Sequence, residues 1–202
     1  ALLVTEIQGL ERLFEATARG AADRPTLARR LAEDYAELEA VGFREKTEAE
    51  IERDRLKKTD PKAAAQRQTV ANQADAIVRG ARAKAIQHYA LLAAEYPNRP
   101  DLDDVLYYLA YEHEQAGDAK AARAAYYDLI QKRPASRWLP HAYLAFGEMF
   151  FAEAQGDPAK WSLAAHAYGE VIKHPPPANR VHAYALYKLA WVHEGTGDHA
   201  RA

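Results

Sequence analysis

The sequence predicts an all-α fold, and three observations support that prediction. Side chains recur at the 3.6-residue spacing of a helix, so that apolar positions fall on one face. One such set is Leu106, Leu109, Ala110 and His113. Alanine is frequent, whereas the 10 glycines and 10 prolines are few, a composition that favours helices over strands. Those few breakers stand between the periodic segments, where helices are expected to end.

The stretch from Pro97 to Pro134 shows the pattern best and predicts two helices joined by a turn at Gly117-Asp118. The second helix repeats apolar residues at steps of four and three, namely Ala122, Tyr126 and Leu129. Pro134 ends it, because proline lacks an N–H group and clashes with the preceding turn. A short glycine turn makes the two helices antiparallel, with their apolar faces together.

These residues resemble the tetratricopeptide repeat, a helix-turn-helix unit with the motif W-x2-L-G-x2-Y, then A-x3-F, then P. The matching positions are Leu106, Leu109, Ala110, His113, Ala122, Tyr126 and Pro134. His113 departs from the motif in kind, because it places a polar ring where the family usually buries a tyrosine.

Three further copies of the pattern are predicted. The residues of the first are Ala85, Tyr89, Leu92 and Pro97; those of the second are Tyr143, Phe146, Gly147, Phe150, Ala164, Tyr168 and Pro176; those of the third are Leu186, Leu189, Ala190 and His193. The second copy contains an insertion between its helices, and Ser136 and Asp157-Pro158 are expected to begin those helices.

The N-terminal part is less regular. Leu3, Ile7, Leu10 and Phe14 trace one helix face, and Asp23 with Pro25 is expected to begin the next helix. A Thr-x-x-Glu capping box at residues 47–50 predicts a further start there, and Asp60-Pro61 predicts another.

Residues 44–67 carry many charges and admit two interpretations. One is a basic arm for a polyanion. The other is a solvated helix, which is favoured because acidic and basic residues alternate instead of clustering.

The predicted organisation is therefore an N-terminal part, residues 1–61, made of irregular helices or a degenerate repeat, and an array of about four repeats over residues 62–202. The resemblance implies a right-handed α-solenoid with a concave face, because each helix pair leaves an apolar side that only a neighbouring pair can cover. The sequence stops within a helical pattern at Arg201-Ala202. We therefore expect the last repeat to be truncated and the chain to be an excerpt.

The long connections between units narrow the resemblance. Units that end in Tyr-Pro before a polar spacer, as at Tyr96-Pro97, are similar to those of bacterial cell-envelope proteins with this repeat. Examples are the Tol-Pal system coordinator, the barrel-assembly lipoprotein and components of gliding-motility complexes. This resemblance implies the periplasm or cell envelope as the compartment, and the cytoplasm stays open.

Composition narrows the classes of partner. A net charge of -2 and a pI near 6.5 argue against nucleic acid or an anionic membrane surface as the main partner. The absence of cysteine excludes disulfides and thiolate zinc sites. No apolar run approaches the length of a membrane span, so direct insertion is not expected.

No catalytic, cofactor or metal site is predicted, and the chain is not expected to be an enzyme. The common phosphate-binding, nucleophile and zinc-protease motifs are all missing. His113-Glu114 and His193-Glu194 are each half of a zinc motif, but a hydrogen-bonded interior histidine explains each better. Acidic residues in a first helical turn, here Asp101, Asp103 and Asp104, could bind a cation, but they more commonly cap the helix and offset its dipole.

The family's peptide-binding members line their groove with residues beside the packing positions of the first helices. On this sequence the resemblance implies a partner-binding set of Asp104, Tyr107, Tyr111, Glu114, Leu144, Glu148, Phe151, Tyr184, Tyr187, Trp191 and Glu194, with Gln115 and His141 beside them. Tyrosine and tryptophan suit interfaces, although any single ring can equally be core between neighbouring helices.

The leading hypothesis is thus a non-enzymatic scaffold that binds a protein or peptide on the concave face. The acids among the aromatic residues suggest a partner with apolar anchors and a Lys or Arg. A self-stacking structural array and the non-catalytic arm of a larger enzyme are the alternatives.

Overall fold

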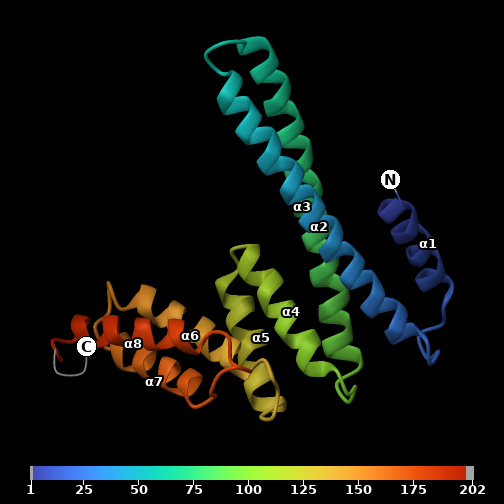
Figure 1. Ribbon diagram of the computed structural model, residues 1–202. Helices are drawn as coiled ribbons and strands as arrows, with labels where there is room; N and C mark the ends of the chain where they lie inside the picture. Colours follow the sequence, from blue (N-terminus) through green and yellow to red (C-terminus); the bar gives the residue numbers. More distant parts are fainter. Residues whose placement is uncertain (1, 199–202) are drawn as a thin grey trace. The chain divides into compact units, whose positions relative to one another are not determined.

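The computed structural model describes residues 2–198, which form helices joined by loops (Figure 1). The helices are α1 (Leu2–Ala16), α2 (Arg24–Leu56), α3 (Pro61–Glu95), α4 (Leu102–Gln115), α5 (Ala119–Lys132), α6 (Leu139–Glu153), α7 (Lys160–Ile172) and α8 (His182–Gly195). The predicted all-α fold is confirmed, since the described part contains no strand. The helical pattern noted at Arg201-Ala202 lies outside the described residues.

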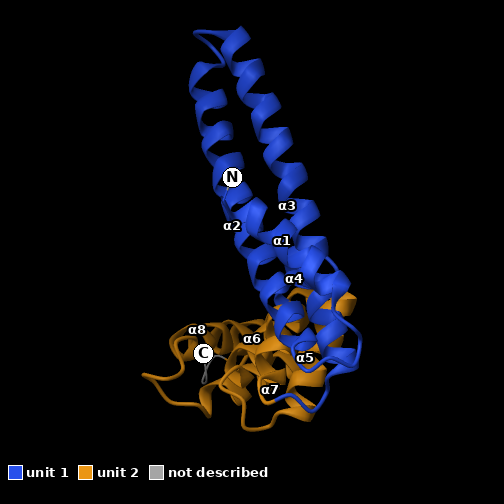
Figure 2. Ribbon diagram, turned by 90° about the vertical axis from the view of Figure 1, so that its right-hand side faces the viewer, with its two compact units in different colours: residues 1–99, 111–118 blue, residues 100–110, 119–202 orange. Residues whose placement is uncertain are grey.

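The chain folds into two compact units (Figure 2). Unit 1 comprises residues 1–99 and 111–118, and unit 2 comprises residues 100–110 and 119–202. Helix α4 therefore contributes to both. Residue 61, where the predicted N-terminal part ends, lies at the turn between α2 and α3, within unit 1.

Unit 1 is dominated by the long antiparallel hairpin of α2 and α3, visible in both ribbon views. One set of its buried positions recurs every seven residues, the spacing of a coiled coil. On α2 these are Ala28, Tyr35, Gly42 and Ala49; on α3 they are Ala64, Ala71, Val78, Ala85 and Leu92. Most are small, so the two backbones approach closely. A Cβ atom at Gly42 would lie 3.1 Å from Val78 Cγ2 and 3.3 Å from Ile77 Cγ2.

A second set of heptad positions pairs polar side chains across the hairpin. Lys46 Nζ lies 2.7 Å from Asp75 Oδ1, Arg53 Nη1 donates to Gln68 Oε1 at 2.6 Å, and Arg82 Nε donates to Glu39 Oε1 at 3.0 Å. Each step of seven residues forward on α2 is matched by a step of seven back on α3. These polar pairs fix one register, as polar residues at such positions do in coiled coils.

The hairpin corrects two expectations. The capping box at residues 47–50 does not begin a helix, because α2 is continuous there and the Thr47 hydroxyl donates to the Phe43 carbonyl at 2.8 Å instead. Residues 62–96 also do not form a helix pair of their own. Almost all of that range belongs to the single helix α3, because Gly80 is flanked by helix formers and Ala71, Ala74 and Val78 are buried along it.

Two predicted helix starts are confirmed. Asp60 caps α3, its carboxylate accepting a hydrogen bond from Ala63 N at 3.0 Å, with Pro61 in the first turn. Helix α2 begins at Arg24, and Pro25 lies in its first turn.

Helix α1 packs on the open end of the hairpin through aromatic and polar contacts. The His88 ring, only 6% exposed, makes an edge-to-face contact with Phe14 at 5.4 Å and stacks on Tyr35 at 6.1 Å. The Tyr35 hydroxyl donates to Glu11 at 2.6 Å. Burial lowers the pKa of His88, so the ring stays neutral among its aromatic neighbours.

Three ionisable side chains, of which Glu112 is buried and Glu39 and Arg82 are partly buried, lie together where the last part of α4 meets the hairpin in unit 1. Arg82 bonds Glu39 and lies 4.0 Å from Glu112 Oε2, and it also donates to the Gln115 carbonyl at 2.8 Å. No N–H or hydroxyl group bonds Oε2 of Glu39 or of Glu112. A proton held between the two carboxyl groups satisfies them. Accordingly, burial and the hydrogen bond with Glu39 raise the pKa of Glu112 to about 8.

We expect the stability of unit 1 to fall as the pH rises from about 4.5 to about 8. The folded-state pKa of Glu112 lies above its ordinary value of 4.5, so in this window the folded state holds a proton that the unfolded state has lost. The stabilisation is complete below this window. It declines by up to ~1.4 kcal/mol per pH unit within it.

The Glu112→Gln variant tests this, because the amide keeps a donor towards Glu39 and cannot ionise. Urea unfolding from about pH 5 to about pH 9 should show a shallower slope for Glu112→Gln than for the parent chain. Glu114→Gln, an exposed change on the same helix, should keep the parent slope. Equal slopes for Glu112→Gln and the parent chain would contradict the assignment.

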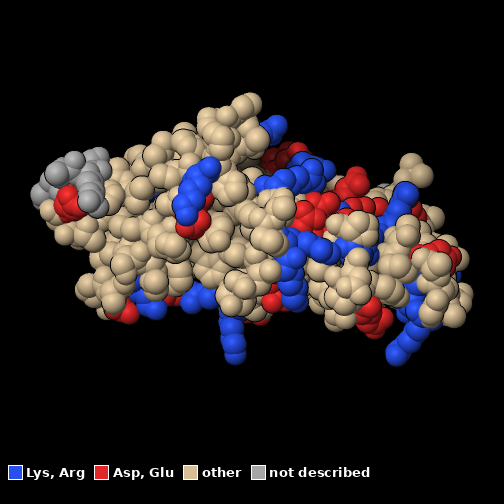
Figure 3. Space-filling view, turned by 90° about the horizontal axis from the view of Figure 1, so that it is seen from below, with Lys and Arg blue, Asp and Glu red and all other residues tan. Residues whose placement is uncertain are grey.

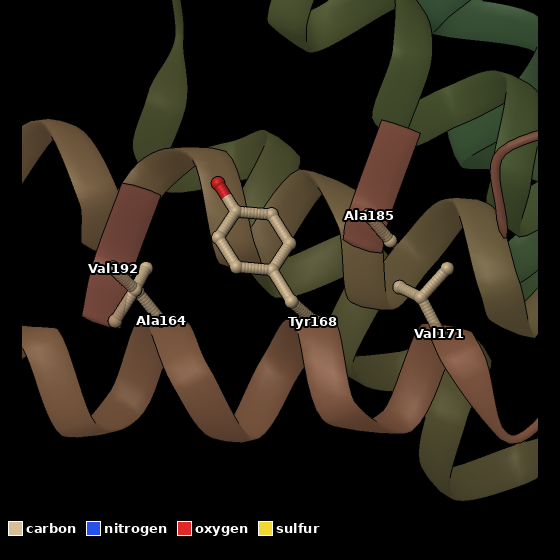
Figure 4. Packing of buried hydrophobic residues seen from close by; sticks show 5 residues of the cluster. All are labelled: Ala164, Tyr168, Val171, Ala185 and Val192. Carbon is tan, nitrogen blue, oxygen red and sulfur yellow. The ribbon is translucent and has the colours of Figure 1, made fainter. Parts of the chain in front are cut away.

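Unit 2 contains the first part of α4 and helices α5 to α8. One core cluster lies between α7 and α8 and comprises Ala164, Tyr168, Val171, Ala185 and Val192, each at most 1% exposed (Figure 4). The Tyr168 ring also fills the space beside Gly147 of α6, where an added Cβ would lie 2.5 Å from ring atom Cε1. Glycine is thus required at 147 by the closeness of α6 to the ring.

The predicted packing positions of α4 and α5 are confirmed as buried. Their exposed fractions are 2% for Leu106, 8% for Leu109, 0% for Ala110, 0% for Ala122, 3% for Tyr126 and 0% for Leu129. The predicted turn at Gly117-Asp118 is confirmed too, and it ends α4 with Gly117 at φ +76°.

The turns that follow α4 and α8 have the same hydrogen bonds. After α4, Gly117 N donates to the Glu114 carbonyl at 2.9 Å and Asp118 N to the His113 carbonyl at 2.9 Å. After α8, Gly197 N and Asp198 N make the same two bonds at 3.0 and 2.9 Å. Each is a Schellman motif, in which a glycine with positive φ satisfies the last carbonyls of a helix.

The loop between α7 and α8 is organised by Asn179, which is 4% exposed. Its Nδ2 donates to the carbonyls of Val171 and His174 at 2.9 and 2.8 Å, and its Oδ1 accepts from Val181 N at 3.0 Å. The side chain therefore satisfies one carbonyl in the last turn of α7 and one just beyond that helix, and it holds the chain at the start of α8.

Candidate partner-binding surface

The most open part of the predicted binding set is an aromatic row on α8, formed by Tyr184, Tyr187 and Trp191. Steps of three and four residues place these side chains along one helix face. They are 46%, 57% and 51% exposed, and consecutive ring centroids lie 6.4 and 6.1 Å apart. Three large rings in contact with one another and with solvent form a surface that can bury apolar area against a partner.

Glu148 of α6 lies at the base of this row and connects it to the core. Its carboxylate accepts hydrogen bonds from the Tyr168 hydroxyl at 2.7 Å, from Lys188 Nζ at 3.1 Å and, weakly, from the Tyr184 hydroxyl at 3.5 Å. Burial and the bond to Glu148 raise the pKa of Tyr168, so the hydroxyl remains a donor. Glu148 is therefore held in place beside the row.

Lys188 links the row to Phe151, another predicted site residue. Its ammonium group lies 3.7 Å from the centre of the Phe151 ring, a cation–π contact. The Phe151 ring makes an edge-to-face contact with Trp161 at 5.1 Å. Leu144 is half-buried against the α7–α8 core. Phe151 and Leu144 therefore support the surface from below more than they extend it.

Asp104 and Tyr107 belong to a second aromatic cluster in unit 2, which is closed by its own contacts. The Tyr107 ring stacks on Trp138 at 3.9 Å with an angle of 6° between the planes. Trp138 Nε1 donates to Asp104 at 2.6 Å, and Arg137 Nη2 reaches the same carboxylate at 3.0 Å. His141 contacts both rings edge-on. These residues are half-buried packing around Trp138, in line with the alternative that single rings are core.

The remaining predicted residues divide between the units. Tyr111 and Glu114 belong to unit 1, where Tyr111 is 42% exposed, and Gln115 lies beside them. Glu194 is exposed on the last turn of α8, in unit 2. The structure thus brings Glu148, Phe151 and the aromatic row together through Lys188.

Two residues that hold the predicted site residues in place, Trp138 and Lys188, were not predicted from the sequence. Both stand outside the repeat positions from which the set was chosen. Trp138 lies in the connection before α6, and Lys188 lies between Tyr187 and the packing position Leu189. A search for basic residues one turn away from the predicted rings would have found Lys188. Its ammonium group is paired with Glu148 and its side chain is 13% exposed, so it offers no open positive charge to a carboxylate of a partner.

The acids and histidines that resembled site motifs have structural contacts. Asp103 accepts from the Ser136 hydroxyl at 2.8 Å, and Ser136 in turn accepts from Trp138 N at 3.1 Å, just before α6. His113 Nδ1 lies 3.9 Å from Asp118, and His193 Nδ1 lies 4.0 Å from Asp198. Within residues 2–198, no group of three or more His, Asp or Glu side chains has the geometry to hold a metal ion.

The surface drawn in Figure 3 shows basic and acidic side chains close to one another. No described helix has the length and hydropathy to cross a membrane.

No model of a known protein family matches the sequence, and no curated protein matches it.

Proposed function

We propose that this protein is a non-enzymatic scaffold that binds a peptide or protein partner through the aromatic row of α8 and the neighbouring Glu148. The exposure of three contacting aromatic rings in one row carries this proposal. Rings of this kind supply most of the binding energy in many interfaces, because they bury a large area with few rotatable bonds. Glu194, which is exposed on the last turn of α8, favours a partner segment that combines apolar anchors with a Lys or Arg.

We further propose that the chain belongs to a solenoid of the tetratricopeptide type, with the aromatic row on its concave face. The identical turns after α4 and α8 support a repeated unit, as do the buried packing positions of α4 and α5. The resemblance to cell-envelope proteins with this repeat suggests a bacterial multiprotein assembly as the setting.

The test replaces Tyr184, Tyr187 and Trp191 together with alanine. Peptides selected on the parent chain from a displayed library should bind this variant at least ~100-fold more weakly, since such residues often contribute about 2 kcal/mol or more each. Thermal unfolding should change little, because all three side chains are about half exposed.

The matched control replaces Phe43, Tyr127 and Leu163 with alanine. These side chains are 57%, 56% and 41% exposed. This second triple variant removes similar exposed apolar surface elsewhere and should keep the parent affinity. Retained binding by the α8 variant, or equal loss in both variants, would refute the proposed surface.

A second candidate function is self-stacking into a longer array. Leu186 of α8 is 45% exposed, whereas Leu106, which stands at the matching repeat position of α4, is 2% exposed. An uncovered leucine at a packing position favours association with another helix. Sedimentation distinguishes the two functions: a strict monomer that still binds the selected peptides excludes self-stacking as the main role.

A further inference from the structure

The turn between α2 and α3 gathers positive charge that the composition of the whole chain conceals. Residues 53–67 include six basic side chains and two acidic ones, although the chain as a whole has a net charge of -2. This segment is the far end of the hairpin, which extends past α1 in both ribbon views (Figures 1 and 2). The electrostatic potential of the far end therefore differs in sign from the net charge of the chain.

Four of these cations make no hydrogen bond or ion pair with any residue in the range 2–198. The four are Arg55, Lys57, Lys58 and Lys62, here called the basic tip. All are exposed to solvent. Their charge is therefore available to an external anion.

The other charges of the segment are already engaged. Arg53 bonds Asp54 and Gln68, Arg67 bonds Glu52 at 2.7 Å, and Asp60 caps α3. Asp54 also attracts Lys57 through space, but neither acid of the segment forms an ion pair with the basic tip.

The rest of the hairpin shows the opposite arrangement. Towards the open end, Lys46 is paired with Asp75, and Arg82 is paired with Glu39. Arg79 also contacts Asp75, at 3.2 Å. Lys46, Arg79 and Arg82 of the shaft are thus each paired with an acid, whereas the cations of the basic tip are not. Alternating acids and bases, which favour a solvated helix for residues 44–67 as a whole, describe the shaft but not the turn.

The chemistry of the basic tip selects among anionic partners. No Phe, Tyr or Trp occurs between Phe43 and Tyr89, so the far end has no ring on which a nucleic-acid base can stack. Lysine is depleted in the cores of protein interfaces, where aromatic residues and arginine are enriched. Three of the four cations are lysines, which act as flexible point charges rather than as planar forks. Such side chains suit a diffuse layer of phosphates better than a shaped protein surface.

The shape of the far end also favours a layer of phosphates. A helical turn is convex and can meet a flat surface end-on. Beside it lies an open hollow of about 410 Å³ lined by Lys57, Asp54, two alanines and the bonded pair of Arg53 and Gln68. Of these groups, the Lys57 ammonium can bond a phosphate. Clusters of four or more Lys and Arg side chains are attracted to anionic lipid headgroups within a Debye length of the bilayer.

We propose that the basic tip of the α2–α3 hairpin docks the protein peripherally on an anionic phospholipid surface. The contact is purely electrostatic, and no part of the hairpin is inserted into the hydrocarbon region. This contact is independent of the aromatic row, which lies in unit 2.

The test measures sedimentation of the whole chain with vesicles of phosphatidylcholine containing about 30% phosphatidylserine, at about 50 mM salt. The chain should bind these vesicles, should not bind pure phosphatidylcholine, and should be released at about 300 mM salt as the Debye length shortens. In the triple variant Lys57→Gln, Lys58→Gln and Lys62→Gln, the partition coefficient should fall roughly 100-fold.

The matched control is the triple variant Arg44→Gln, Lys120→Gln and Arg180→Gln, which makes the same change in net charge at exposed positions far apart in the sequence. It should bind vesicles nearly as well as the parent chain. Equal weakening in the two variants, or no binding of the parent chain, would overturn the proposal. Tighter binding to a short DNA duplex or to polyglutamate than to vesicles at equal salt would also overturn it, in favour of a nucleic-acid or an acidic protein partner.

Discussion

Replacing Arg82 with methionine should destabilise unit 1 by about 3–5 kcal/mol at neutral pH. The guanidinium group is 17% exposed and is the positive member of a buried cluster with Glu39 and Glu112, whose side chains are 12% and 5% exposed. Methionine fills a similar volume but leaves the two carboxyl groups with one proton and no cation. It also removes the donor to the Gln115 carbonyl, so the last turn of α4 loses its bond to the hairpin.

Urea unfolding of the Arg82→Met variant measures this loss. The control is Arg79→Met, one turn earlier on α3, whose side chain is 71% exposed and pairs with Asp75; it should change stability by less than ~1 kcal/mol. Adding Glu112→Gln to Arg82→Met should recover part of the stability, because the amide carries no charge and still donates to Glu39. A loss for Arg82→Met no larger than that for Arg79→Met would contradict the cluster's role.

Replacing Tyr168 with alanine should destabilise unit 2 by about 3–5 kcal/mol, the usual effect of removing a buried ring. Tyr168 is 0% exposed, packs in the α7–α8 core and donates to Glu148. Removing it leaves a cavity and deprives Glu148 of its shortest hydrogen bond. Tyr127→Ala on α5, a position 56% exposed, is the surface control and should cost far less.

The close approach of Gly147 to the ring makes this prediction more specific. Gly147→Ala alone should cost about 1–3 kcal/mol despite the better helix propensity of alanine, because its Cβ would overlap the ring. In the Tyr168→Ala background the same change should be neutral or stabilising. A double-mutant cycle by urea unfolding measures the coupling, and additive effects would show that the α6–α7 contact is not as tight as the structure has it.

The sequence was most informative where large apolar residues alternate with breakers. Between Pro97 and Pro134 it predicted both helices of the pair, their buried faces and the glycine turn, and the structure has all three. In such a helix pair, a large apolar side chain such as Leu106 or Leu129 can be buried only on the face that meets the other helix. Local periodicity therefore determines the packing there.

The α2–α3 hairpin could not be derived in the same way. Its contact positions are mostly alanine and glycine, such as Gly42, Ala49 and Ala71, and its second heptad set is charged. Neither gives an apolar stripe, so charge pairs that join distant segments, such as Lys46 with Asp75, resembled a solvated surface. The seven-residue recurrence of small residues was the available signal, and its meaning depended on which helix lay opposite.

For the candidate surface, the sequence placed candidate rings but could not say which of them pack together. Tyr107 and Tyr187 stand at matching positions of the predicted repeat, yet Tyr107 stacks on Trp138 whereas Tyr187 is 57% exposed. The difference comes from a side chain outside the repeat pattern. A repeat motif therefore predicts where a ring points, and its neighbours decide whether it stays accessible.

The fixed register of the hairpin has a geometric consequence. Glu39, Lys46 and Arg53 of α2 pair with Arg82, Asp75 and Gln68 of α3. Because these pairs recur at matched steps of seven residues, the length of the α2–α3 hairpin is set in units of seven residues. Removing residues 47–53 together with residues 68–74 would leave the pairs nearer the open end in place and shorten the reach by about 10 Å. Deletions that are not a multiple of seven residues in each helix would set the two helices out of step. The distance between the turn and the rest of unit 1 can thus change only by whole heptads.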